Sequence, residues 1–94
     1  LEVRFEELVI LDGEQEHKLT PREMELLRYM MERPNKVLSR EQILTELWGK
    51  NDFFLGRSMD VFVSRLRKYL QNEPGVTLET KRGVGFIFKM SHTP

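Results

Sequence analysis

The residues whose types and spacing could do chemistry lie together in Arg57–Leu70, RSMDVFVSRLRKYL. Placed on a helix at about 100° per residue, this stretch divides into two faces. Its apolar face is spaced as in a core-packed helix and consists of Met59, Val63, Leu66 and Leu70. The opposite face mixes basic, hydroxyl and aliphatic groups and consists of Arg57, Val61, Ser64, Arg65 and Lys68. Such a mixture could read bases in a DNA major groove, although from this stretch alone a solvated basic surface is an equally good interpretation.

The composition indicates one folded domain. The chain has 94 residues, of which 39% are hydrophobic and 32% charged, which suits a single modest core. Cysteine is absent, which excludes disulfides and cysteine-ligated metals. No apolar run approaches the roughly 20 residues of a membrane-spanning helix, and we expect a cytoplasmic protein. Because the first residue is Leu1 rather than Met, we expect the chain to be a fragment or a processed product of a longer protein.

The net charge is zero, but the charges are unevenly distributed along the chain. Residues 1–18 contain six acidic and two basic side chains, whereas residues 57–70 contain four basic and one acidic, and residues 79–90 three basic and one acidic. A domain with charges separated in this way can present a basic face while remaining neutral overall.

The first half of the chain predicts strands followed by two helices. Residues 1–19 read as short antiparallel strands with a turn at Asp12-Gly13, and His17 is expected to be a surface residue. A helix is predicted from Leu19 to Arg33 because Thr20, Pro21 and Glu23 form a capping box with proline at the first helical position. A second helix is predicted over Val37–Gly49, with Ser39 as its N-cap and Gly49 as its end.

The second half predicts a loop, a third helix and a hairpin. Lys50–Gly56 reads as a loop that contains Phe53 and Phe54, and the third helix is expected to be capped by Ser58 and to end near Gln71-Asn72. Two strand-like runs, VTLETK and GFIFKM, then flank the turn at residues 82–85. Helices two and three, joined by about seven residues, would form a helix-turn-helix, and the basic hairpin follows the candidate recognition helix directly.

This order favours DNA binding over the other classes of function. A helix can enter the major groove while the hairpin tip reaches the adjacent minor groove or the backbone. The alternative is a protein-interaction module without DNA binding, which the apolar residues of the loop would support. The pattern does not favour an enzyme, and we expect no catalytic residue, metal or cofactor.

Four segments carry a more specific signal: LTPREMELLRYM, LSREQILTELWG, RSMDVFVSRLRKYL and ETKRGVGFIF. Together they resemble the winged-helix effector domain of OmpR/PhoB-type response regulators, and the resemblance extends over nearly the whole chain. It implies an α+β fold over residues 1–94 with a four-stranded N-terminal antiparallel sheet, three helices and a C-terminal hairpin wing. It also implies a bacterial two-component regulator of transcription with a receiver domain before Leu1 and a partner sensor kinase.

The resemblance assigns roles to individual positions. The recognition helix would span about residues 58–71, and the wing tip residues 82–85. Base or groove contacts would come from Val61, Ser64, Arg65, Lys68 and Arg82. Phosphate contacts would come from Arg57, Arg67, Thr80, Lys81 and Trp48, although a partly wet core position is at least as good an interpretation of Trp48. Phe53 and Phe54 match a loop that touches RNA polymerase in some members, and two copies of the domain would bind direct-repeat half-sites.

The sequence departs from the family pattern at several positions. Phe62 occupies a position often held by histidine and Ser64 one often held by arginine, while Lys81 and Phe86 replace the usual valine and tyrosine. These departures concern the DNA sequence that is bound rather than the fold.

Overall fold

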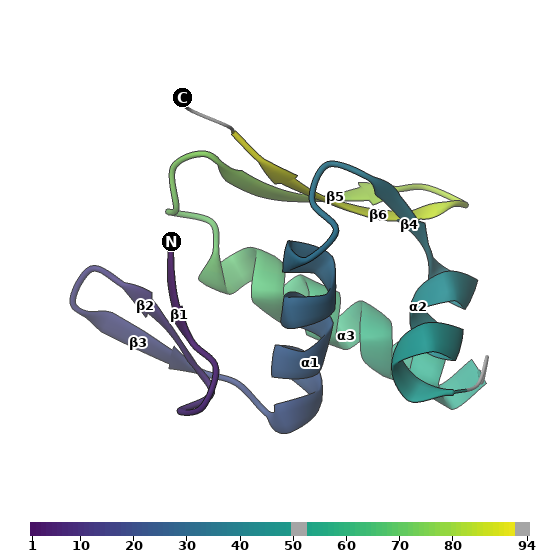
Figure 1. The fold of residues 1–94 in the computed structure, drawn as a ribbon, viewed down its shortest axis with the longest axis horizontal. Helices are drawn as coiled ribbons and strands as arrows, with labels where there is room; N and C mark the ends of the chain where they lie inside the picture. Colours follow the sequence, from purple (N-terminus) through teal and green to yellow (C-terminus); the bar gives the residue numbers. More distant parts are fainter. Residues whose placement is uncertain (50–52, 92–94) are drawn as a thin grey trace.

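The computed structural model describes residues 1–49 and 53–91, without the side chains of residues 53–55. Two small antiparallel sheets flank a group of three helices in the described residues: in Figure 1 the first sheet lies to the left of the helices and the second lies above them. The first sheet has the order β1-β2-β3 and the second has the order β4-β6-β5. The predicted α+β class with a C-terminal hairpin is confirmed.

The N-terminal sheet consists of β1 (Glu2–Arg4), β2 (Val9–Asp12) and β3 (Gln15–Lys18). The resemblance implied four strands, but the described residues form three in this sheet, with β1 and β2 joined by a turn at residues 5–8 in which Leu8 takes a φ of 58°. His17 was expected on the surface. It is instead half-buried and stacks on Tyr69, with ring centroids 4.8 Å apart. This stack attaches β3 to the last turn of the third helix.

Helix α1 (Pro21–Met31) begins as the sequence predicts. The Thr20 hydroxyl accepts a hydrogen bond from the backbone N–H of Glu23 at 3.2 Å, and the Glu23 carboxylate accepts one from the backbone N–H of Thr20 at 2.8 Å. Two backbone donors that the helix itself cannot satisfy are thereby bonded.

The segment before the second helix is a strand, which corrects the prediction of a helix over Val37–Gly49. Strand β4 (Val37–Ser39) pairs with β6, and helix α2 (Arg40–Trp48) follows it. Ser39 is the N-cap of α2 and Gly49 its C-cap, as predicted. Three residues are too few to reveal a strand by their pattern, and the partner of β4 lies almost 50 residues further along the chain.

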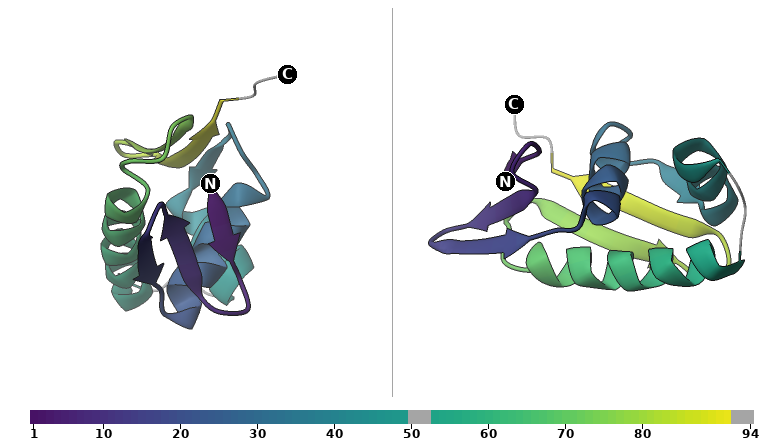
Figure 2. Two further views of the ribbon diagram at one scale, coloured as in Figure 1. Left: turned by 90° about the vertical axis from the view of Figure 1, so that its left-hand side faces the viewer. Right: turned by 90° about the horizontal axis from the view of Figure 1, so that it is seen from below.

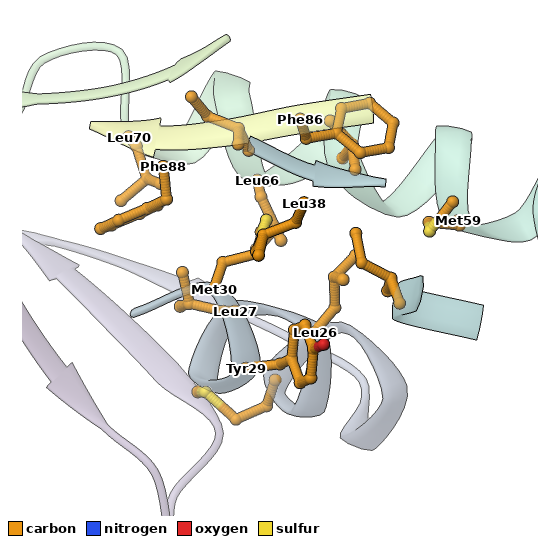
Figure 3. Close-up of a cluster of buried hydrophobic side chains, with 14 of the residues drawn as sticks. Leu26, Leu27, Tyr29, Met30, Leu38, Met59, Leu66, Leu70, Phe86 and Phe88 are labelled. Atoms are coloured by element: carbon orange, nitrogen blue, oxygen red, sulfur yellow. The ribbon is translucent and has the colours of Figure 1, made fainter. Parts of the chain in front are cut away.

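Helix α3 (Phe53–Tyr69) begins before the predicted N-cap, so Ser58 lies inside it and the prediction of a loop as far as Gly56 was wrong. The apolar face is confirmed, because Met59, Val63, Leu66 and Leu70 are each at most 2% exposed. They pack in one core with α1 and the second sheet, which contribute residues such as Leu26, Met30 and Phe88 (Figure 3). The core therefore fixes the rotation of α3 and leaves its opposite face outside.

The second sheet adds β5 (Val76–Lys81) and β6 (Gly85–Met90) to β4. Lys81 pairs with Gly85, which confirms the predicted hairpin. The central strand β6 passes so close to β4 that a Cβ atom on Gly85 would lie 1.9 Å from the carbonyl oxygen of Leu38. Glycine is therefore required at residue 85 for this contact.

Candidate nucleic-acid interface

The outer face of α3 is exposed along the length that the sequence indicated. Arg57, Val61, Ser64, Arg65 and Lys68 are all exposed, and 48% of the aliphatic Val61 is accessible. Figure 2 (right) shows α3 along one edge of the molecule, with the other helices and the second sheet on its inner side. A helix placed in this way can enter a groove of DNA without rearrangement of the fold.

Arg65 is exposed but already has a protein partner. Its Nη1 donates to Oε2 of Glu23 at 3.1 Å, and the Arg65 side chain remains 52% exposed while that of Glu23 is 2% exposed. This pair was not predicted from the sequence, because the two residues are 42 positions apart. The burial of Glu23 could nevertheless have been predicted, because this residue lies three positions before Leu26 and seven before Met30 and therefore on the buried face of α1.

A hollow of about 240 Å³ separates the outer face of α3 from the wing. It is lined by residues of both elements and by the first residue of α2, and the lining includes Arg40, Asp60, Ser64, Arg67, Thr80, Lys81 and Arg82. Two segments predicted separately to bind DNA therefore border one depression that is rich in cationic side chains.

Arg67 and Thr80, both predicted to contact phosphate, also contact each other. Arg67 Nε donates to the carbonyl oxygen of Leu78 at 3.0 Å, and Nη2 donates to Thr80 Oγ1 at 2.6 Å. Arg67 thus joins α3 to β5. The Thr80 hydroxyl hydrogen is not used in this contact and can be donated to a further acceptor.

The wing tip carries Arg82, which is exposed beside Gly83 and the 54%-exposed Val84. Below the tip, the Glu79 carboxylate lies 3.0 Å from Lys89 Nζ and 3.7 Å from Lys81 Nζ. The hydrogen bond from Lys89 is the largest of the effects that lower the pKa of Glu79. Glu79 therefore stays ionised at neutral pH and offsets part of the positive charge of the wing.

Arg40 and Asp60 form a further ion pair, beside the hollow, that was not predicted from the sequence. Arg40 Nη1 bonds to the Asp60 carboxylate, and Nη2 donates to the carbonyl oxygen of Gly56 at 3.1 Å. The first residue of α2 thus contacts the N-terminal half of α3. Asp60 places one negative charge on an otherwise basic surface.

Trp48 is half-buried and packs as a structural residue at the end of α2. Its Nε1–H donates to Glu25 at 3.1 Å, Arg22 lies 5.4 Å above its ring, and Phe62 meets it edge-on at 6.3 Å. This arrangement satisfies its one polar group. The RNA-polymerase prediction for Phe53 and Phe54 concerns side chains outside the described residues.

Neither a cluster of metal-binding side chains nor a membrane-spanning helix is found in the part of the chain that the structure describes. Over residues 1–49 and 53–91, no group of three or more His, Cys, Asp or Glu side chains is arranged to hold a metal ion. Within the same residues, no helix is long and apolar enough to cross a bilayer.

The residues that the structure describes form three helices, an N-terminal sheet and a hairpin beside an exposed basic helix, which is the architecture of a winged-helix domain. Residues 14–88 match the protein family described as "Transcriptional regulatory protein, C terminal". The chain belongs to this family, which comprises the DNA-binding output domains of OmpR/PhoB-type response regulators. The resemblance found in the sequence is confirmed, and the family is one of transcriptional regulators rather than of enzymes.

Relatives in sequence support this assignment. The chain is 44% identical over 80 residues to the uncharacterized transcriptional regulatory protein YclJ of Bacillus subtilis (strain 168). The matched region covers 85% of this chain and 35% of YclJ. It is 40% identical over 82 residues to the phosphate regulon transcriptional regulatory protein PhoB of Escherichia coli (strain K12). This matched region covers 84% of this chain and 35% of PhoB. The chain thus spans about a third of the length of these relatives.

Solved structures agree in fold. The DNA-binding domain of Bacillus subtilis CssR superposes with a TM-score of 0.74 at 30% identity, over 93% of this chain and 97% of that one. The DNA-binding domain of Klebsiella pneumoniae RstA, solved in complex with the RstA box, superposes with a TM-score of 0.66 at 25% identity, over 86% and 82% of the two chains.

Proposed function

We propose that this domain binds double-stranded DNA sequence-specifically, with α3 in the major groove and the wing tip at the adjacent minor groove. The observation that carries the proposal is the shared hollow, where cations of α2, α3 and the wing border one surface: Arg40, Arg67, Lys81 and Arg82. Phosphates of one duplex can contact such a surface from both sides, and neutralising them supplies most of the affinity.

The exposed face of α3 supplies the base contacts in this proposal. Arg65 and Lys68 carry donors suited to guanine, Val61 offers methyl groups to thymine, and Ser64 can bond to either kind of edge. Arg82 enters the minor groove, where an exposed cation is attracted by the negative potential.

The remaining polar residues would contact phosphates. Arg57 and Lys81 are exposed at the two sides of the surface, and Thr80 can donate its hydroxyl hydrogen while it accepts from Arg67. Arg67 would contact a phosphate through Nη1, because its Nε and Nη2 are bonded to Leu78 and Thr80 of β5. A phosphate contact by Trp48 requires its indole N–H to leave Glu25.

The parent protein is proposed to be a cytoplasmic two-component response regulator. A receiver domain phosphorylated by a sensor kinase would precede this domain and bring two copies together on direct-repeat half-sites, which raises their apparent affinity. Phe53 and Phe54 would meet RNA polymerase. The names of the sequence relatives support a regulator of transcription, and their greater length supports a further domain, whereas the kinase, the direct repeats and the polymerase contact rest on the family resemblance alone.

The alternative of a protein-interaction module is less well supported. A solved neighbour of similar fold is bound to its own DNA box. Arg65, Lys68 and Arg82 are exposed on the two elements that would face a duplex, an alignment that a pure interaction module does not need.

The test is selection of bound duplexes from a random-sequence pool at two salt concentrations. We expect enrichment of a short motif, repeated in tandem about one helical turn apart. Retention without an enriched motif, lost steeply with salt, would reduce the function to backbone binding. No retention at low salt would overturn the proposal and make residues 53 and 54 the site to test.

A further inference from the structure

Glu23 is the one charged residue fully buried among the residues that the structure describes, at 2% exposure. A buried carboxylate is costly unless each oxygen is bonded. Both oxygens of Glu23 are: Oε1 accepts from the backbone N–H of Thr20 at 2.8 Å, and Oε2 accepts from Arg65 Nη1 at 3.1 Å. One side chain thus joins the first turn of α1 to the candidate recognition helix.

Among the residues that the structure describes, Glu23 is the one side chain that forms a hydrogen bond with Arg65. The guanidinium group is a rigid planar fork with five N–H donors. One nitrogen is bonded to Glu23, while half of the side chain stays accessible on the outer face of α3. The donors left over can reach a base edge without breaking the bond to Glu23.

We propose that Glu23 is a positioning residue that determines DNA sequence specificity through Arg65 without touching DNA. The inference rests on the proposed function. A guanidinium group fixed before binding loses less rotamer freedom when it meets DNA. A fixed fork also matches the paired acceptors of one guanine and is misplaced for other bases, whereas a mobile arginine adapts to several.

Glu23 also caps α1, so its effect on stability must be separated from its effect on Arg65. Glu23→Gln makes this separation. Its single amide oxygen can still accept from Thr20, but the amide NH2 then faces the guanidinium group and cannot accept from it. Thr20→Ala is the matched control, because it removes the Thr20 hydroxyl from the capping box and leaves the carboxylate–arginine pair in place.

The experiment measures binding of the 94-residue chain to the duplex selected from the random pool and to each single-base-pair variant of it, by fluorescence anisotropy. The wild type should penalise changes at one base pair by about 5- to 150-fold, and Arg65→Ala should abolish that penalty. Glu23→Gln should reduce the same penalty at least about fivefold and leave other positions unchanged, while Thr20→Ala keeps the wild-type profile. In Arg65→Ala, adding Glu23→Gln should change the profile no further.

Thermal unfolding of each variant shows whether binding is measured on folded protein. If Glu23→Gln does not fold, Glu23→Asp replaces it, because the shorter side chain withdraws the carboxylate from Arg65. An unchanged penalty profile in the folded variant would overturn the inference while the proposed function stands. An equal loss at every base pair would also overturn it, because Glu23 would then act through the fold alone. A wild-type chain that selects no motif would overturn both.

Discussion

Arg82 differs from the cations of α3 because it is exposed at the end of a hairpin, beside Gly83 with its φ of 77°. Arg82→Ala is expected to weaken binding to every duplex, to reduce the preference for A·T pairs at the minor-groove position, and to reduce the salt slope by about 1. The measurement is the salt dependence of Kd on the selected duplex and on one with G·C pairs at that position.

Arg4→Ala is the control for Arg82→Ala, because it removes the same charge from the N-terminal sheet, which lies away from the wing tip (Figure 1). Equal effects of the two substitutions would show that net charge, rather than the position of Arg82, governs binding.

Tyr29 gives the fold a pH dependence. Burial, followed by the hydrogen bond that its hydroxyl donates to Glu46 at 2.8 Å, raises the pKa of Tyr29 above its ordinary value. The pKa of Tyr29 is higher in the folded state than in the unfolded chain, where it is about 10. The contribution of the protonated Tyr29 to the stability of the fold is therefore complete below about pH 10 and is lost as the pH rises through the folded-state pKa. The free energy of unfolding of the wild type should therefore fall relative to that of Tyr29→Phe in alkaline solution.

Urea denaturation of both proteins over a series of pH values from neutral to alkaline checks this expectation. A difference between the two free energies that stays constant at high pH would show that Tyr29 ionises equally easily in both states.

At the scale of the elements, the contact of β6 with β4 gives a sharp prediction about stability. Gly85→Ala places a methyl group against the carbonyl oxygen of Leu38, and it should lower the free energy of unfolding by at least about 3 kcal/mol. Gly83→Ala is the matched substitution at the tip, where a Cβ meets nothing within 4 Å and only the positive φ opposes alanine. It should cost about 1–2 kcal/mol. Equal losses in urea denaturation would contradict the close approach of the two strands.

The wing also contains an acidic residue that is expected to weaken DNA binding, because Glu79 neutralises part of the positive charge of Lys81 and Lys89. Glu79→Gln should tighten binding to a non-selected duplex several-fold at low salt and make the salt slope more negative by up to about 1. Glu14→Gln, in the turn between β2 and β3, makes the same charge change in the other sheet and should leave binding nearly unaltered. Unchanged or weaker binding by Glu79→Gln would show that the lysines do not face DNA.

At the scale of the whole molecule, a single domain of this kind buries roughly 600–1,000 Å² on DNA and binds weakly. We therefore expect two copies to occupy a duplex that carries two motifs in direct repeat, spaced by one helical turn. Sedimentation of the complex would give the stoichiometry. One domain per duplex, or a preference for inverted repeats, would contradict the tandem arrangement.

Local signals in the sequence were sufficient for most of the elements. The capping box at Thr20 and Glu23, the cap at Ser39 and the stripe from Met59 to Leu70 are all set by residues within a few positions of one another. The start of α3 was predicted too late because the apolar run before Gly56 resembles a loop that is tucked under helices, whereas it continues the helix.

Contacts between distant segments could not be predicted in this way. Strand β4 is defined by its pairing with β6, and Glu23 meets Arg65 only after α1 and α3 have packed together. The sequence therefore identified the exposed face of α3 and the wing tip, but not the internal bonds of Arg65, Arg67 and Trp48, which change what these residues can offer to DNA.

The outer face of α3 and the wing tip are proposed to form one DNA-binding surface. The most direct measurement is the change of backbone amide NMR signals of the chain on titration with the selected duplex. We predict that the largest changes fall together on residues 57–68 and 80–85, with little change in β1, β2 and β3. Changes confined to α3 without the wing, or centred on the N-terminal sheet, would contradict the account.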